Sequence, residues 1–395
     1  MVHEFHRRGL RERVLTLPIM VALVLTMVWR QIEGVTALAR LVHQELVLWV
    51  PPLRISAQAL EQRLRCLPAD LFRLVLEHVL PRLHAAWPHR QRPLPTAIAW
   101  ARSRFSALLV WDASTLDVLQ RRVGVLREID PAPLAGRITA LLRLDSRLPW
   151  RVWYEADPKA HEQNHWSLLL AALPAAALVV FDLGYTNFQR FAQLTAAQVT
   201  WITRAKQNLV FTLDRVIAQS ATVCDRLIRI GANEDQQTVR LIEMYFEGKW
   251  YRYLTNELDP TRLPAVYAVM LYRQRWRIED AFLIIKRLLG LSYFWCGAQN
   301  AVELQIWATW LLYAVLIDLT DAVAEALRRP FADISVEMVF RSLPYATGPC
   351  QRGEAPSVVA YLATHAQLLG LIKRPRAKPK PPKMLDQTED TLTWD

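Results

Sequence analysis

The stretch YRQRWRIEDAFLIIKRLLGL, residues 272–291, places two acidic side chains among five basic ones. Wound as an α-helix at about 100° per residue, it brings Tyr272, Arg275, Glu279 and Lys286 onto one face. An apolar stripe lies beside that face, so the helix is expected to pack by the stripe. The remaining edge would then present one carboxylate surrounded by positive charge.

Such an edge suits phosphoryl transfer, which needs carboxylates to hold Mg²⁺ and cations to hold phosphates. In this interpretation Glu279 faces the metal, Arg275 and Lys286 face phosphates, and Tyr272 hydrogen-bonds a phosphate. The alternative is an ordinary amphipathic helix in which Glu279 pairs with Arg275 on a solvated face. That alternative leaves the excess of basic side chains unexplained.

Two further acids follow short apolar runs elsewhere in the chain. RFSALLVWDAST (104–115) and AALVVFDLGY (176–185) each read as a buried strand with an aspartate at its exit, Asp112 and Asp182. Sites in α/β sheets form at the carboxyl ends of strands. We therefore expect both aspartates at one edge of a sheet.

The rest of the chain must position these residues. Apolar residues recur at helical spacing before the linker PHRQRPLP, and strand and helix patterns alternate from 104 to 206, which predicts an α/β core. Pro264 opens a long helix that carries the 272–291 stretch, and an apolar helix follows at 301–327. The expected organisation is a helical N-terminal domain at 1–95, a catalytic core at 96–206 and 258–345, a β insertion at 207–257, and a C-terminal region with a basic, proline-rich tail at 346–395.

The overall charge points to an anionic partner. The 395 residues carry a net charge of +11, with a pI of about 9.7, which favours nucleic acid or an anionic membrane surface. A genome that prefers arginine on ordinary surfaces is the alternative. Four scattered cysteines without a CxxC pair argue against a disulfide framework and a cysteine zinc site, and they indicate a reduced, intracellular protein.

One apolar segment raises the question of a membrane anchor. VLTLPIMVALVLTMVW, residues 14–29, follows several arginines, but its 16 residues fall short of the roughly 20 that a membrane span needs. No small-residue cleavage site follows it. A buried helix is the expectation here and an anchor the alternative, and the apolar runs at 168–181 and 306–317 are also expected in the core.

The spacing Tyr272, two residues, Arg275, three residues, Glu279, six residues, Lys286 matches the Y-(2)-R-(3)-E-(6)-K signature in full. On this signature the chain resembles the DDE transposases of bacterial insertion sequences, specifically the fourth family. VWDASTLD resembles the family's first aspartate block and VVFDLGYTNF its second, while WITRAK and YLTNEL resemble the neighbouring strands. The likeness covers about 104–320. One departure is Ala113, where the family usually has glycine.

The resemblance implies an α/β fold with an RNase H-like catalytic core, a mixed sheet flanked by helices, interrupted by a β-strand insertion. It implies that Asp112, Asp182 and Glu279 are catalytic and bind Mg²⁺, with Mn²⁺ as a substitute. Tyr272, Arg275 and Lys286 would contact DNA phosphates.

The implied reaction is cut-and-paste transposition. Water cleaves a strand at a transposon end, the freed 3′-OH forms a hairpin that is reopened, and the final 3′-OH attacks target DNA. The implied partners are double-stranded DNA, both transposon ends and target, and a second copy of the chain in a synaptic homodimer. A cytoplasmic, nucleoid-associated protein without a membrane is expected. The family also flips a base against an aromatic ring; Trp276 and Trp295 are near the motif, with packing in the core as the alternative.

Two other functions stay open. HEQNH, residues 161–165, matches the H-E-x-x-H pattern of zinc proteases, with His161 and His165 as ligands and Glu162 as base. The extended form of that pattern fails, since Leu168 and Ala171 stand where glycine and histidine are required. The second alternative is a catalytically silent or repurposed relative, which would bind DNA without metal-dependent cutting; the three intact acids argue against it.

Overall fold

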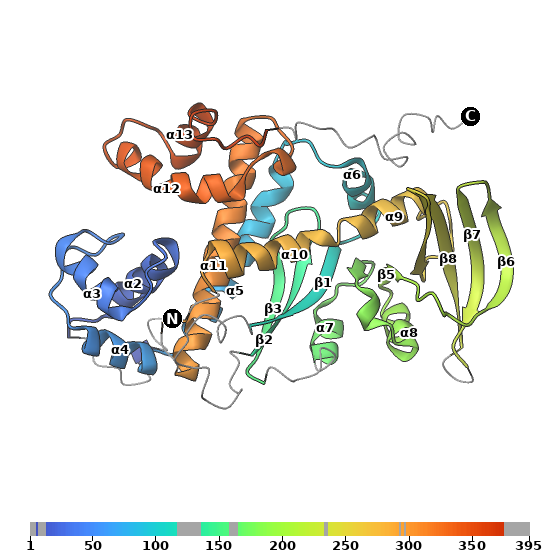
Figure 1. The fold of residues 1–395 in the computed structure, drawn as a ribbon, viewed down its shortest axis with the longest axis horizontal. Helices are drawn as coiled ribbons and strands as arrows, with labels where there is room; N and C mark the ends of the chain where they lie inside the picture. Colours follow the sequence, from blue (N-terminus) through green and yellow to red (C-terminus); the bar gives the residue numbers. More distant parts are fainter. Residues whose placement is uncertain are drawn as a thin grey trace.

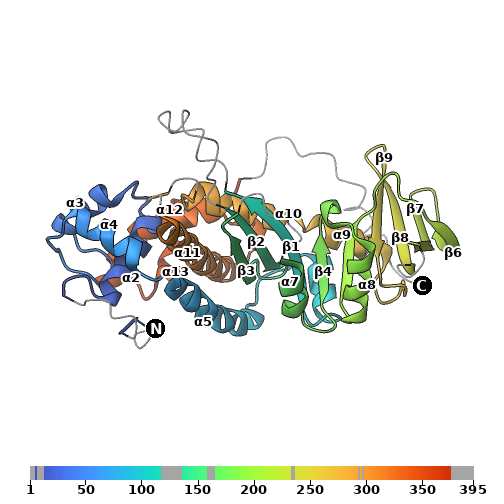
Figure 2. The same ribbon diagram turned by 90° about the horizontal axis from the view of Figure 1, so that it is seen from below.

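A nine-stranded sheet runs from the middle of the molecule to one end, and most of the helices gather at the other end (Figures 1 and 2). The computed structural model describes residues 5–6, 13–116, 136–157, 165–232, 236–291, 294–295 and 298–374. The strand order is β3-β2-β1-β4-β5-β9-β8-β7-β6. The basic tail from residue 375 onward lies outside the described residues.

Five strands form the core of the sheet. β1 is parallel to β4 and β4 to β5, whereas β2 is antiparallel to both β1 and β3. The strands are β1 (Leu108–Thr115), β2 (Arg137–Arg143), β3 (Pro149–Glu155), β4 (Leu178–Phe181) and β5 (Thr200–Arg204). The apolar starts of β1 and β4 are fully buried, as expected of parallel strands covered on both faces. The order 3-2-1-4-5 with β2 reversed is that of the RNase H-like fold, so the predicted α/β class is confirmed.

Four antiparallel strands extend this sheet. They are β6 (Thr212–Gln219), β7 (Val223–Ile230), β8 (Gln237–Phe246) and β9 (Lys249–Thr255). Their order in the sheet is reversed, because β9 returns to pair with β5 while β6 forms the outer edge. Glu247 and Gly248, both with positive φ, make the tight turn between β8 and β9. The β residues expected at 207–257 therefore continue the core sheet and do not form a separate one.

Helices cover both faces of the core sheet. α7 (Trp166–Ala172) and α8 (Phe188–Ala196) pack on one face through Leu169, Phe191 and Leu194. The other face is covered by α9 (Ala265–Arg273), α10 (Trp276–Leu283) and α11 (Gln299–Ala326). Asp112 and Asp182, which the sequence predicts at one edge of the sheet, lie on this second face.

α11 joins the sheet to the remaining helices through one continuous core. Around it lie α2 (Leu17–Trp29), α3 (Val35–Gln44), α4 (Ala57–Cys66), α5 (Asp70–Ala86), α6 (Thr96–Arg102), α12 (Val336–Gln351) and α13 (Val358–Thr364). The boundary expected between residues 345 and 346 falls inside α12.

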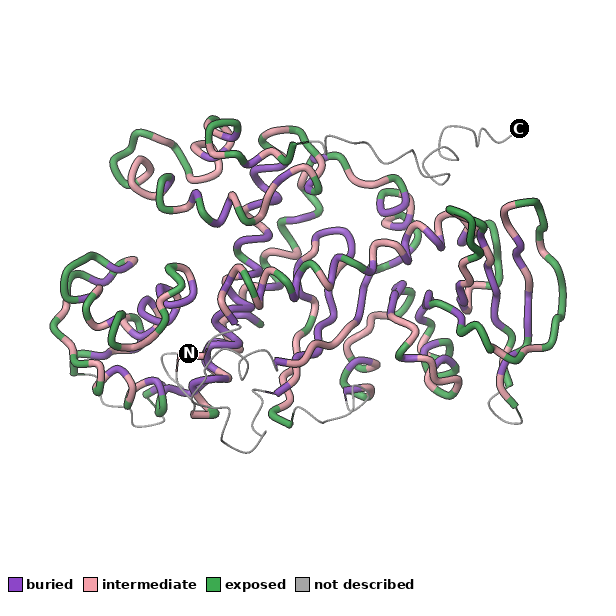
Figure 3. The backbone as a smooth tube through the Cα atoms, viewed as in Figure 1, coloured by how far each residue is buried: buried purple, intermediate pink, exposed green. Residues whose placement is uncertain are grey.

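Two of the three apolar segments are largely buried, whereas the 168–181 run is buried only at Leu169 and over 177–181, and Leu168 is 49% exposed. Figure 3 shows α11 buried along most of its length. α11 is long and apolar enough to cross a membrane, but 78% of its most apolar window is buried inside the protein. α2, which contains most of the 14–29 run, is largely buried as well.

The helix expected to run unbroken through residues 272–291 is interrupted, and that prediction was wrong. α9 ends at Arg273 and α10 begins at Trp276. Between them the amides of Gln274 and Arg275 bond to carbonyls three residues back, which tightens the chain locally. After α10 the chain widens into a π-helical turn, Ile284–Leu288, a feature common at functional sites.

Candidate active site

The two aspartates stand side by side at the carboxyl end of two parallel strands. Trp111 in β1 is the Cα partner of Phe181 in β4, and Asp112 and Asp182 are the residues that follow them. Trp111 and Phe181 point into the core beneath α7 and α8. Because side chains alternate along a strand, both aspartates point to the opposite face, beneath α10. β1 continues past Asp112 to Thr115 along β2 alone, so Asp112 lies where the pairing with β4 ends.

Glu279 reaches the same place from the first turn of α10, which lies across β1 in Figure 1. Arg275 is only 9% exposed, and its guanidinium lies among all three acids. Its Nη1 is 2.7 Å from Glu279 Oε1 and 3.5 Å from Asp112 Oδ2, and its Nε is 3.7 Å from Asp182 Oδ1. Three carboxylates from separate parts of the chain thus meet at one cation.

Tyr272 supports Asp182 from the last turn of α9. Its hydroxyl donates to Asp182 Oδ1 at 3.3 Å, and its ring packs edge-on against Tyr253 at 5.2 Å. Burial, and then the negative charge of Asp182, raise the pKa of Tyr272 well above its usual value. The hydroxyl therefore stays protonated and continues to donate. In this structure it contacts a carboxylate, whereas the sequence interpretation gave it to a phosphate.

Lys286 closes the β1 side of the site. Its Nζ donates to Ser114 Oγ at 2.7 Å and to the Thr115 carbonyl at 2.5 Å. These bonds tie the π-helical turn to the end of β1. A pocket of about 390 Å³ is lined by Asp112, Ala113, Ser114, Glu279, Phe282, Leu283, Lys286 and Arg287. All six predicted site residues therefore lie at this one edge of the sheet.

The chemistry of the donors fits Mg²⁺ or Mn²⁺, which prefer carboxylate oxygens. In the described part of the chain, no three acidic, histidine or cysteine side chains lie at metal-ligand spacing. At this edge the guanidinium of Arg275 stands between the three carboxylates. The donor set therefore fits the ion by type, while Arg275 occupies the position between the donors.

The structure distinguishes the two tryptophans near the motif and adds one arginine to this edge of the sheet. Trp276 is 63% exposed beside the site, with the Arg275 guanidinium 5.4 Å from its ring, so it does not pack in the core. Trp295 is partly buried against the core. Arg204, in the WITRAK stretch, ends the third parallel strand of the same edge. Periodicity along the sequence predicts the strands but not the register between them. It therefore could not show that Arg204 lies at this edge of the sheet.

Of the HEQNH segment, the structure describes only His165. His161 and Glu162 lie outside the described residues. His165 is buried, and its Nδ1 lies 2.9 Å from Thr139 Oγ1. Burial lowers the pKa of His165, so it is neutral and already engaged in the core at neutral pH.

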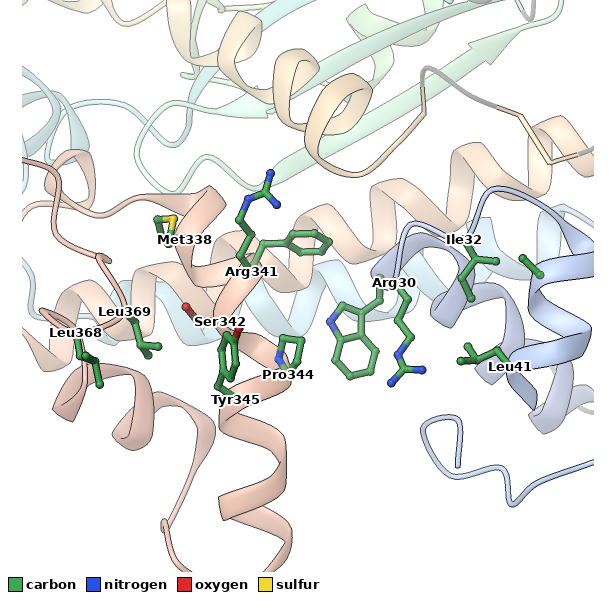
Figure 4. A pocket seen from close by; sticks show the side chains of 13 residues that line it. Arg30, Ile32, Leu41, Met338, Arg341, Ser342, Pro344, Tyr345, Leu368 and Leu369 are labelled. Atoms are coloured by element: carbon green, nitrogen blue, oxygen red, sulfur yellow. The ribbon is translucent and has the colours of Figure 1, made fainter. Parts of the chain in front are cut away.

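A larger groove, of about 1020 Å³, lies away from the carboxylates, between the N-terminal helices and α12 (Figure 4). Arg30, Ile32 and Leu41 line one side, and Met338 and Tyr345 line the other. Its lining contains no acid, histidine or cysteine. The groove therefore offers no carboxylate, imidazole or thiol, despite its size.

Comparison with known proteins points in one direction. Residues 137–315 match the family model described as a transposase DDE domain, a region that holds Asp182 and Glu279 and begins after Asp112. A putative transposase of Sinorhizobium fredii is 28% identical, over 57% of this chain and 70% of the relative. A probable transposase for an insertion sequence element of Geobacillus stearothermophilus is 22% identical, over 50% of this chain and 52% of the relative.

A solved structure also resembles the chain. The cryo-EM structure of the piggyBac transposase synaptic complex with hairpin DNA is 12% identical, with a TM-score of 0.41, covering 95% of this chain and 82% of that chain.

Proposed function

We propose that this chain, which is related to the bacterial insertion-sequence transposases with a DDE domain, cuts and joins DNA by metal-dependent phosphoryl transfer. The observation that carries the proposal is the convergence of Asp112, Asp182 and Glu279 on the single guanidinium of Arg275. Acids this close together repel one another unless a cation lies between them. An enzyme that binds a divalent cation needs such a set of acids, whereas a DNA-binding protein without activity does not.

The three carboxylates would hold Mg²⁺, or Mn²⁺ in its place, and the ion would supply an activated oxygen nucleophile and neutralise charge on the leaving oxygen. The chain itself supplies position and charge. Tyr272 orients Asp182 through its protonated hydroxyl. Arg275, once it leaves the carboxylates, faces the substrate phosphate. Lys286 keeps a fixed positive charge at the β1 side of the pocket.

The order of steps we propose is the cut-and-paste route of the family that the signature resembles. Water cleaves one strand at each element end, the 3′-OH attacks the opposite strand to form a hairpin, and the reopened end attacks target DNA. Two ends must be handled together, which favours a homodimer on the DNA of the nucleoid. The net charge of +11 suits repeated contact with phosphates along such DNA.

A catalytically silent DNA-binding relative is the second candidate. It keeps the positive surface but needs no acid at the edge of the sheet. Intact Asp112, Asp182 and Glu279 favour the enzyme, because three acids that meet at one cation repel one another and serve no purpose in DNA binding alone.

The test uses purified full-length protein and a plasmid that carries the DNA flanking its gene. We expect cuts at the flanking repeats with Mg²⁺ or Mn²⁺, and none with EDTA or with a plasmid that lacks the flanks. Binding to the flanking DNA without cuts in either metal would contradict the enzymatic proposal and favour the silent relative. If the protein neither binds nor cuts the flanking DNA, both candidates are contradicted.

A further inference from the structure

Arg204 lies in the same row of the sheet as the two site aspartates. Asp112 and Asp182 stand level across β1 and β4, as the register of these strands requires. Val180 is the Cα partner of Ile202 in β5, so two residues further along Arg204 stands level with Asp182. Ile202 belongs to the core beneath α9 and α10, and alternation sends Arg204 to that same face. Asp112, Asp182 and Arg204 therefore lie side by side at this edge, one on each of three parallel strands.

A second arginine and two aromatic rings accompany Arg204. Its guanidinium lies 5.5 Å from the centre of the Tyr251 ring on β9. Arg273, from the end of α9, lies 5.7 Å from the centre of the Phe246 ring on β8. The two rings are 6.2 Å apart. Each ring thus holds one guanidinium by a cation–π contact, and the two cations are presented together.

Neither cation is neutralised within the described residues. No carboxylate there forms an ion pair with Arg204 or Arg273, although most arginines of the neighbouring strands do pair with acids: Arg226 with Glu243, Arg240 with Asp225, and Arg252 with Glu243. Arg204 is exposed to solvent and Arg273 is half-buried. Burial raises the pKa of Tyr253, and the positive charges of Arg204 and Arg273 lower it. Both charges therefore act on the hydroxyl of Tyr253. Two arginines that form no ion pair within the described residues, beside the proposed phosphoryl-transfer site, are suited to bind an anion from outside the chain.

We propose that Arg204 and Arg273 bind the backbone phosphates of the DNA strand where it leaves the carboxylates on the β5 side. This inference rests on the proposed function and adds a phosphate-binding pair opposite Lys286. Two strand spacings, about 10 Å, separate Asp112 from Arg204 across the edge. That distance corresponds to about three nucleotide steps at 3.4 Å each. Phe246 and Tyr251 are positioning residues that keep the guanidinium planes in place.

The test compares the salt dependence of DNA binding in EDTA, where no cutting occurs. The full-length protein binds a duplex of its flanking end sequence, and we compare Arg204→Gln/Arg273→Gln with the matched control Arg215→Gln/Arg229→Gln. The control removes two exposed arginines from β6 and β7 of the same sheet, far from the carboxylates. We expect the first pair to reduce the slope of log K against log salt by about 1.8, because each lost phosphate contact accounts for about 0.9. The control pair should leave the slope unchanged.

A second measurement tests the contribution of individual DNA phosphates to affinity. Neutral methylphosphonates are placed one at a time up to three nucleotides from the cleavage position. At one or two of these sites the wild-type chain should lose at least fivefold in affinity, while the Arg204→Gln/Arg273→Gln variant should lose nothing further. Arg204→Lys/Arg273→Lys, which keeps both charges, should retain most of the wild-type slope. A variant slope equal to that of the control, or equal methylphosphonate losses in both proteins, would overturn the inference.

The outcomes separate this inference from the proposed function. If the wild-type chain binds and cuts its flanking DNA but the slope does not change in the Arg204→Gln/Arg273→Gln variant, only the assignment of the two arginines fails. If the wild-type chain does not bind the duplex, both fail. Equal thermal midpoints for all variants exclude misfolding as the cause of a lower slope.

Discussion

Arg275 lies 2.7 Å from Glu279, four residues further along the chain, and the same guanidinium also contacts the two aspartates of the neighbouring strands. On an exposed helix an acid and a base at this spacing form a weak surface pair. Here the arginine is 9% exposed and meets three acids, so it works as an internal cation. In the protein without DNA, Arg275 therefore neutralises the carboxylates that would bind the metal.

Arg275→Gln should strengthen Mn²⁺ binding to the DNA-free protein. The guanidinium competes with the ion for the same oxygens, and a charge-assisted hydrogen bond contributes about 1.5–3 kcal/mol, or about ten- to hundredfold in affinity. Titration calorimetry with Mn²⁺ measures the change. Arg273→Gln is the control, since Arg273 contacts none of the three acids in the described structure. Equal or weaker Mn²⁺ binding by Arg275→Gln would show that the arginine does not compete with metal.

Lys286→Ala should weaken binding to flanking DNA and lower the salt slope by about 0.9, the contribution of one phosphate contact. Two of its acceptors, Ser114 and the Thr115 carbonyl, are uncharged. Binding isotherms in EDTA at several salt concentrations give the slope. Lys249→Ala, on the exposed turn of the β8–β9 hairpin, is the control. If the two variants have the same slope as the wild type, Lys286 does not contact a phosphate.

Tyr272→Phe should reduce the rate of strand cleavage by about tenfold while leaving DNA affinity close to that of the wild type. The substitution keeps the ring that packs on Tyr253 and removes only the hydrogen bond to Asp182, whose loss costs about 1.5 kcal/mol for a charged acceptor. Because the pKa of Tyr272 is raised, the wild-type advantage should be constant from pH 7 to 9. Single-turnover cleavage across this range is the measurement. An advantage that disappears by pH 9 would mean that the hydroxyl loses its proton and is not held as described.

His84 should make the folded protein sensitive to mild acid. Burial, and then the positive charge of Arg143, lower the pKa of His84 from 6.5 to about 4. Below pH 6.5 the unfolded chain takes up a proton that the folded chain refuses, so stability falls as the pH drops from 6.5 toward 4. Between pH 7 and 5 this group alone should cost about 2 kcal/mol of unfolding free energy.

Urea unfolding at pH 7 and pH 5, compared between the wild type and His84→Gln, isolates this contribution. Glutamine can still donate to the Pro149 carbonyl that His84 contacts at 2.9 Å, but it does not titrate. The variant should lose about 2 kcal/mol less than the wild type over the interval. The same loss in both proteins would mean that His84 is not held neutral in the folded state.

The sequence predicted that Asp112 and Asp182 stand at the ends of strands because each carries a local signal. Asp112 and Asp182 each end a continuous apolar run, and such runs form buried parallel strands. Periodicity also gave the alternating strands that became β6–β9. It did not predict that β9 returns to pair with β5, because pairing between distant strands is decided by the whole sheet.

The path of the motif helix could not be predicted in the same way. Its break at Gln274 and Arg275 contains no proline or glycine, and a helical wheel assumes a straight axis. Tertiary contacts favour the break, since Tyr272 points to Asp182 from one segment and Glu279 enters the site from the next. The roles of Arg204 and Arg273 depend on the register of β4, β5, β8 and β9, which the spacing along the chain does not contain.

The most direct test of the central claim is strand cleavage by Glu279→Gln on flanking DNA in Mn²⁺, measured together with binding of the same DNA in EDTA. Glutamine keeps the size of the side chain and can still contact Arg275, but it lacks the negative charge that a divalent ion requires. We predict that cleavage falls by at least a thousandfold while binding stays within about threefold of the wild type. Cleavage at the wild-type rate by this variant would contradict the claim that Glu279 completes a metal-binding set with Asp112 and Asp182.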